Sequence, residues 1–269
     1  MPNAIQSRGF GGRIDSTYGR CRAWKSVMST IRVARASVWV LVVLSVGLSC
    51  WLLLRPNDKD ARESTVAFVG DSYFAGTKLG GIGRSNIASL LAGRFGWNSL
   101  NAAVGGTGYA HASSTSPPYA LAQLPAVLSH DPSLILVEGS INDGHAEPAS
   151  AEAAAKNLYA VIAGRLPGVR IVVVGPISPG RATGSLAALD DAMRRAANSC
   201  GLPYIDASGE DWLPAGIPGL IGSDGVHPTD AGHQRMATLL GDDLVRLGVV
   251  SAEGDVRSAA NESLRCAGA

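Results

Sequence analysis

Two short motifs, 150 residues apart in this 269-residue chain, hold the side chains that nucleophilic catalysis requires. Ser72 closes a Gly-Asp-Ser motif that directly follows an apolar run, and His227 stands in a Ser-Asp-Gly-Val-His-Pro motif at 223–228. A serine hydroxyl attacks only when a neighbouring base takes its proton. The turn at Gly225 would let Asp224 reach the imidazole Nδ1–H, fix the tautomer and leave Nε2 to face the serine. We therefore predict a Ser72–His227–Asp224 triad. The alternative is that each is a turn, cap or loop residue, with Asp224 only closing its own turn.

Acyl transfer also needs N–H donors aimed at the oxyanion that develops during attack. Three candidates are predicted: the main-chain N–H of Ser72, the main-chain N–H of Gly106 in the glycine-rich stretch 105–108, and the side-chain amide of Asn142 in the segment 139–143. The structural alternatives are a turn that needs positive φ at the glycines and a simple turn role for Asn142. We expect Asp143 to be structural. The sequence holds no complete phosphate-binding loop, dinucleotide fingerprint or His-Glu-x-x-His, so no cofactor and no metal are predicted.

Taken in this order, the four segments resemble the SGNH (GDSL-type) hydrolase family, over roughly residues 64–247. The resemblance implies ester or thioester hydrolysis through an acyl-enzyme, and it matches Gly106 and Asn142 to the family's glycine and asparagine. The third segment departs from the usual Gly-x-Asn-Asp, because Ser140 takes the place of the glycine and Gly139 comes one residue early. The aromatic and imidazole side chains near these segments either line the pocket or pack in the core: Tyr73, Phe74, Tyr109, His111 and Tyr119.

Apolar runs alternate with helical patterns along the chain from residue 65. Strands are predicted at 65–69, 99–104, 134–137, 169–174 and 203–205, and helices at 85–95, 119–129, 149–166, 186–199 and 229–247, the last capped by Thr229. This alternation predicts a three-layer α/β/α sandwich with a parallel, flavodoxin-like sheet of about five strands, preceded by one N-terminal transmembrane helix. Ligands bind beyond the carboxyl ends of such strands, which is where the four segments lie.

The N-terminal quarter has a different character. Residues 1–62 carry ten basic and three acidic residues, a net charge of +7, whereas residues 63–269 carry −6. Residues 36–54 hold no charge, and as a helix they would span about 28 Å, close to the core of a bilayer. The basic flank predicts a cytoplasmic N-terminus. The expected organisation is a basic cytoplasmic tail (1–35), a signal anchor (36–54), a linker (55–64), an extracytoplasmic hydrolase domain (65–250) and a polar tail (251–269). A cleaved signal peptide and a buried core helix are the alternatives.

Outside the membrane, Cys200 and Cys266 would either form a disulfide or remain two free thiols. The charged share of 17% and the net charge of +1 exclude a disordered chain and a generally basic nucleic-acid binder. The predicted function is a membrane-tethered serine esterase acting on small acyl esters, lipids or acylated glycans of the cell envelope. A cell-envelope O-acyltransferase and a non-catalytic binding module are the alternatives, and the sequence leaves the oligomeric state open.

Overall fold

A five-stranded parallel sheet forms the centre of the computed structural model, which describes residues 64–257 and Cys266. Its strands are β1 (Thr65–Val69), β2 (Asn98–Asn101), β3 (Leu134–Glu138), β4 (Arg170–Val174) and β5 (Tyr204–Ile205), in the order β2-β1-β3-β4-β5. Each neighbouring pair is parallel; Val66 of β1, for example, is opposite Ser99 of β2 and Leu134 of β3. This is the flavodoxin-like order, whose ligand site lies where the order reverses, at β1 and β3. The predicted α/β class and parallel sheet are confirmed.

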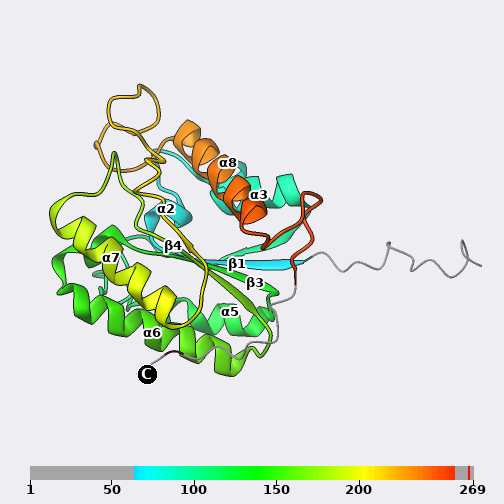
Figure 1. Cartoon of the computed structure of the whole chain (residues 1–269). Helices are drawn as coiled ribbons and strands as arrows, with labels where there is room; N and C mark the ends of the chain where they lie inside the picture. The colour runs from blue at the N-terminus through cyan, green and yellow to red at the C-terminus, as the bar shows by residue number, and fades with distance from the viewer. Residues whose placement is uncertain (1–63, 258–265, 267–269) are drawn as a thin grey trace, which may run out of the picture. The chain divides into compact units, whose positions relative to one another are not determined.

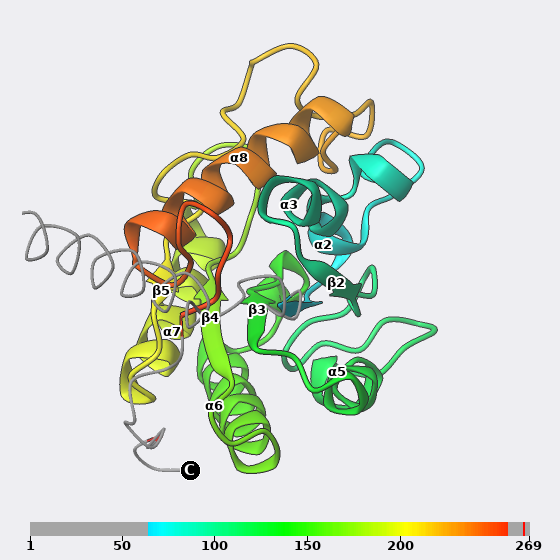
Figure 2. The same ribbon diagram turned by 90° about the vertical axis from the view of Figure 1, so that its right-hand side faces the viewer.

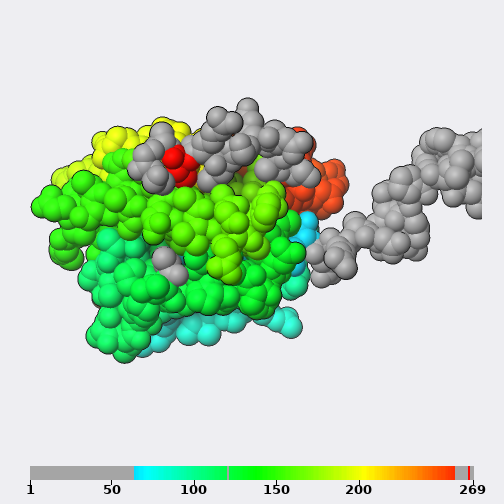
Figure 3. All heavy atoms as spheres, turned by 90° about the horizontal axis from the view of Figure 1, so that it is seen from below, coloured from blue at the N-terminus to red at the C-terminus, as the bar shows by residue number. Residues whose placement is uncertain are grey.

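Helices cover both faces of the sheet, as Figures 1 and 2 show. Val66 and Phe68 face the layer of α3 (Ile87–Phe95) and α8 (Asp230–Arg246). The alternate side chains, such as Val69, face α5 (Leu124–His130), α6 (Pro148–Arg165) and α7 (Gly184–Ser199). Figure 3 shows α5 and α6, in green, on the face seen from below. Because both faces of the inner strands are buried, their sequences are continuous apolar runs.

The remaining elements are short: α2 (Ser72–Ala75), η2 (Gly83–Ser85), α4 (Tyr119–Ala122) and η3 (Ile141–His145). The single helix predicted at 119–129 is two helices that meet at Gln123, because Pro125 has no N–H to continue a helix and stands in the first turn of α5. Strand β2 ends at Asn101 rather than at 104. The Asn101 side chain accepts a hydrogen bond from the Ala103 N–H at 3.1 Å, which turns the chain there.

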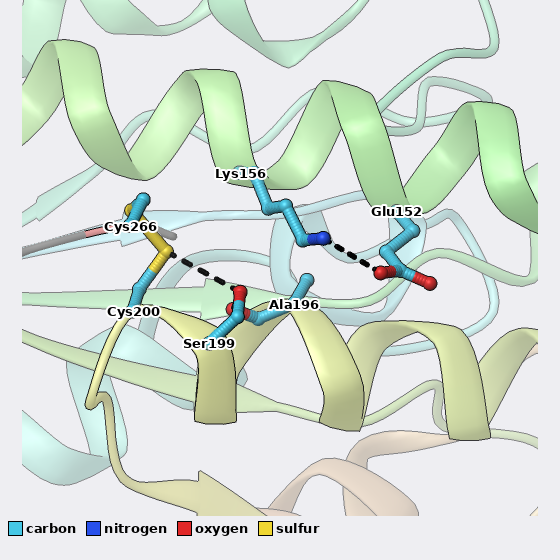
Figure 4. Close-up of a disulfide and its surroundings, with 6 residues drawn as sticks. All are labelled: Glu152, Lys156, Ala196, Ser199, Cys200 and Cys266. Carbon is cyan, nitrogen blue, oxygen red and sulfur yellow. Dashed lines mark hydrogen bonds and ion pairs between the residues drawn. A yellow bond between two sulfur atoms is a disulfide. The ribbon is translucent and has the colours of Figure 1, made fainter. Parts of the chain in front are cut away.

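The cap of the last helix and a disulfide are both formed. Thr229 caps α8 by accepting the Gly232 N–H at 3.2 Å. Cys200, at the C-terminal end of α7, forms a disulfide with Cys266 on the side that faces α6 (Figure 4). Both alternatives for these cysteines were open in the sequence, and the structure shows the bonded one.

The predicted segments 1–35 and 36–54, and nearly all of the linker 55–64, lie outside the described residues. Within the described part of the chain, no helix is both long and apolar enough to cross a membrane. The anchor therefore stays a prediction. Residues that follow 250 turn back onto the domain, where Trp97 donates its indole N–H to the Gly254 carbonyl at 2.7 Å.

Candidate active site

The structure brings Ser72, His227 and Asp224 together at the carboxyl edge of the sheet, although 155 residues separate the serine from the histidine. His227 Nε2 lies 2.9 Å from Ser72 Oγ, and His227 Nδ1 lies 2.6 Å from Asp224 Oδ2. An ionised carboxylate only accepts hydrogen bonds, so the proton between the last two groups belongs to Nδ1. Nε2 of a neutral imidazole is then free to accept the serine proton.

Local structure fixes the Asp224 carboxylate in this orientation. Its other oxygen, Oδ1, accepts the main-chain N–H groups of Val226 at 2.9 Å and of His227 at 3.0 Å. Gly225, with φ of 72°, supplies the left-handed residue that this tight turn needs. The hydrogen bond from His227, followed by those from the main chain, lowers the pKa of Asp224 to about 2. Asp224 is therefore ionised throughout the neutral range.

Tyr73 holds the histidine loop against the nucleophile, a role that the sequence did not reveal. Its hydroxyl donates to the Val226 carbonyl at 2.8 Å, and its ring centroid lies 6.2 Å from that of His227. Five residues were expected either to line the pocket or to pack in the core. Four of them are at most 3% exposed and pack in the core: Tyr73, Phe74, Tyr109 and Tyr119. His111 is partly exposed.

Two of the predicted oxyanion donors, the main-chain N–H groups of Ser72 and Gly106, form no hydrogen bond with any other described residue. Ser72 is the first residue of α2, which directly follows β1. Gly106 follows β2 with φ of 75°, and a Cβ on it would lie 3.2 Å from the Cβ of Ser113. A Cβ on the preceding Gly105 would lie 3.6 Å from the Cβ of Ser72. The glycine-rich loop therefore runs beside the nucleophile.

The third predicted donor, the Asn142 amide, stands in a buried polar cluster after β3. Its Nδ2 lies 2.8 Å from Ser140 Oγ, 3.0 Å from the Thr107 carbonyl and 3.1 Å from Asp71 Oδ2. Its neighbour Asp143 is structural, as expected. The Asp143 carboxylate accepts three main-chain N–H groups of the loop 109–111, at 2.7, 3.0 and 2.8 Å.

Gln123 fixes the main chain just before the nucleophile. Its amide oxygen accepts the Gly70 N–H at 2.9 Å, and its amide nitrogen donates to the Gly70 carbonyl at 2.8 Å. This role of Gln123 was not predicted, because the sequence pattern places the residue inside one long helix. The break at Pro125, which was visible in the sequence, was the signal that a side chain there could turn toward the sheet.

The described residues contain no group of three or more His, Cys, Asp or Glu side chains that could hold a metal ion.

Comparisons with known proteins place these observations in a family. Residues 68–235 match the GDSL-like lipase/acylhydrolase family. A GDSL lipase of Mycobacterium tuberculosis is 32% identical over 208 residues, which cover 74% of this chain and 89% of that protein. The chain belongs to the GDSL-like lipase/acylhydrolase family, and it is an ester-hydrolysing enzyme of the SGNH type.

Solved structures share the fold at lower identity. A lipase/acylhydrolase from Enterococcus faecalis superimposes with a TM-score of 0.54 at 15% identity, covering 73% of this chain and 99% of that one. A family two carbohydrate esterase from Clostridium thermocellum superimposes with a TM-score of 0.56 at 19% identity, covering 69% of this chain and 65% of that one. Both matches support the α/β architecture described above.

Proposed function

We propose that the protein is an extracytoplasmic serine esterase that cleaves acyl or acetyl esters through a Ser72–His227–Asp224 triad and an acyl-enzyme. The observation that carries the proposal is the unbroken hydrogen-bonded series from Ser72 Oγ through both imidazole nitrogens to the Asp224 carboxylate.

In the first half of the proposed reaction, His227 Nε2 takes the Ser72 proton while Oγ attacks the ester carbonyl. The N–H groups of Ser72 and Gly106 and the Asn142 amide stabilise the oxyanion, and Asp224 stabilises the imidazolium. The C–O bond to the alcohol then breaks, and the imidazolium gives its proton to the leaving oxygen. In the second half, His227 takes a proton from water, whose oxygen attacks the acyl-enzyme. The carboxylic acid leaves and Ser72 regains its proton.

The proposed substrates are acyl esters of the cell envelope, such as lipids or acylated glycans. The Mycobacterium tuberculosis relative is described as a lipase, and the Clostridium thermocellum structure is that of a carbohydrate esterase. The Cys200–Cys266 disulfide supports an extracytoplasmic location, because disulfides persist in oxidising compartments. Tethering through residues 36–54 would hold the enzyme at the membrane surface.

The test is hydrolysis of p-nitrophenyl acetate and longer p-nitrophenyl esters by the purified full chain. Ser72→Ala and His227→Ala should each lower kcat/KM by roughly a thousandfold or more, because each removes a group that acts in bond formation. Ser129→Ala and His130→Ala serve as matched controls, since both residues lie exposed at the end of α5 and bond only locally. Wild-type rates in Ser72→Ala would refute the proposal.

A further inference from the structure

Two carboxyl groups lie buried side by side beneath the nucleophile. Glu138 is the last residue of β3, Asp71 directly precedes Ser72, and both side chains are fully buried. Glu138 Oε2 accepts the main-chain N–H of Asp71 at 3.0 Å. A Cβ on Gly70 would lie 2.5 Å from the same oxygen, so only glycine leaves room for this contact. The pair is therefore built into the turn that carries Ser72.

The Asp71 carboxylate is surrounded by donors. Its Oδ1 accepts the Tyr73 N–H at 2.8 Å, and its Oδ2 lies 2.6 Å from the Ser140 hydroxyl and 3.1 Å from Asn142 Nδ2. An ionised carboxylate satisfies all three donors, because it offers only acceptors. Ser140, which stands where the family pattern usually has glycine, thus links Asp71 to the Asn142 amide.

Only one of the two carboxyl groups can carry a charge in this setting. Two like charges in one buried site disfavour ionisation of the second. Burial raises the pKa of both acids, and that of Glu138 lies well above its usual range. The donors are unevenly shared: the Asp71 carboxylate accepts from Tyr73, Ser140 and Asn142, whereas Glu138 accepts only the Asp71 N–H and its Oε1 has no hydrogen-bond partner among the described residues. The charge is therefore expected on Asp71 and the proton on Glu138.

The other titratable groups around the pair leave this assignment in place. Asp143, Tyr73 and Tyr119 also interact electrostatically with Glu138, and each would add a further negative charge if it ionised. The charge of His227, when protonated, favours ionised Asp71. Among the described residues, no Lys or Arg forms an ion pair with either carboxyl.

We propose that Glu138 is a neutral positioning residue, and that the single negative charge left on Asp71 holds the Ser140 hydroxyl and the Asn142 amide in one orientation. Glu138 acts by accepting the Asp71 N–H, which holds the main chain next to Ser72, and by placing no second charge beside the Asp71 carboxylate. The consequence is an oxyanion donor that is oriented before substrate arrives, which affects the acyl-transfer step more than substrate binding. This inference rests on the proposed function, since it assigns a task to groups around the same nucleophile.

Substitutions of similar shape at the two acids test the proposal in the full chain. Glu138→Leu lacks both oxygens and should lower kcat about tenfold with KM within about twofold. Glu138→Gln should restore most of the lost kcat, because its amide oxygen can accept the Asp71 N–H and the side chain stays uncharged. Asp71→Asn should lower kcat about tenfold or more, because its amide nitrogen would oppose one of the donors that Asp71 now accepts.

Two results would overturn the proposal. One is a Glu138→Gln enzyme as slow as Glu138→Leu, which would mean that Glu138 acts as an anion. The other is an Asp71→Asn enzyme with wild-type kcat. Should Asp71→Asn fail to fold, as judged by circular dichroism, Ser140→Ala replaces it: kcat several-fold lower with unchanged KM is expected, and wild-type kcat would contradict the proposal.

Ser72→Ala, measured alongside, separates this inference from the proposed function. An active Ser72→Ala enzyme refutes the esterase mechanism itself. If Ser72→Ala is inactive while the variants at Glu138 and Asp71 keep the wild-type kcat, only the positioning role is refuted.

Discussion

The three residues of the proposed triad differ in how deeply they are buried. The Ser72 residue is only 7% exposed, whereas the side chains of His227 and Asp224 are 28% and 38% exposed. The loop that carries the latter two is ordered mainly by its own hydrogen bonds and by the Tyr73 hydroxyl. The imidazole orientation therefore depends strongly on the Asp224 carboxylate.

Asp224→Asn should lower kcat by about a hundredfold or more, because an amide can stabilise the wrong imidazole tautomer and carries no charge to oppose the imidazolium. Steady-state hydrolysis of p-nitrophenyl acetate by the full chain measures the effect. Asp191→Asn, at an exposed position of α7, is the matched control and should keep the wild-type kcat. A kcat for Asp224→Asn within twofold of wild type would show that the carboxylate contributes nothing to catalysis.

The elements that position these residues were largely predictable from the sequence. β1, β3 and β4 are apolar runs that end next to glycine or a polar turn, and α8 begins at its predicted cap Thr229. Their order along the chain brings the residues after β1, β2 and β3 to one edge, which explains why Ser72, Gly106 and Asn142 were identified as candidates. The pairing of Ser72 with His227 was predicted because a serine nucleophile needs a base and because the four segments in order resemble the SGNH family.

The supporting residues were not predictable, because their roles come from contacts between distant segments. Glu138 ends an apolar strand and carries no local sign that it accepts the main-chain N–H of Asp71, 67 residues earlier. Gln123 lies between the separate helices α4 and α5; Pro125 marks that break in the sequence, but nothing there marks Gly70 as the partner of Gln123. Hydrophobic periodicity predicts which face of a helix or strand is buried. It does not predict which two polar groups form a hydrogen bond across the core.

His233 in α8 illustrates a buried polar group with consequences for stability. It is fully buried, neither ring nitrogen has a hydrogen-bond partner among the described residues, and its ring packs against Gly81. Burial lowers its pKa to about 4, an effect that Asp230 opposes only in part. In the unfolded chain the histidine pKa is about 6.5. Between pH 4 and 6.5, therefore, the unfolded chain binds a proton at this residue and the folded protein does not.

Stability should consequently fall as the pH drops from about 6.5 toward 4, and His233 should contribute about 3 kcal/mol to that loss. His233→Leu removes the titrating group, so its free energy of unfolding should decrease less over this range than that of wild type. Urea unfolding at several pH values between 7 and 4.5 measures the difference. His130→Ala, at an exposed position, should leave the wild-type slope unchanged, and parallel curves for wild type and His233→Leu would contradict the prediction.

On the scale of the whole molecule, the proposed catalytic residues and the disulfide lie at opposite ends of the strands. The motif residues follow the carboxyl ends of the strands, whereas α7, which connects β4 to the parallel β5, must run back and end near the amino ends. Cys200 caps that end of α7 and is only 3% exposed, and Cys266 packs against the same apolar cluster. The disulfide therefore joins the C-terminal tail to the domain at a distance from the proposed catalytic residues.

Removing this crosslink should lower stability without changing the chemistry. The bond closes a segment with a sequence separation of 66 residues, and restricting such a loop in the unfolded chain is worth about 2–4 kcal/mol. Cys266→Ser should lose that much free energy of unfolding and become insensitive to dithiothreitol, while wild type treated with dithiothreitol should approach it. At 25 °C, kcat should stay within about twofold of wild type, because the fold at the carboxyl edge is unaltered. A large fall in kcat in a folded Cys266→Ser enzyme would show that the tail shapes the catalytic edge, and unchanged stability would show that the bond does not restrain the unfolded chain.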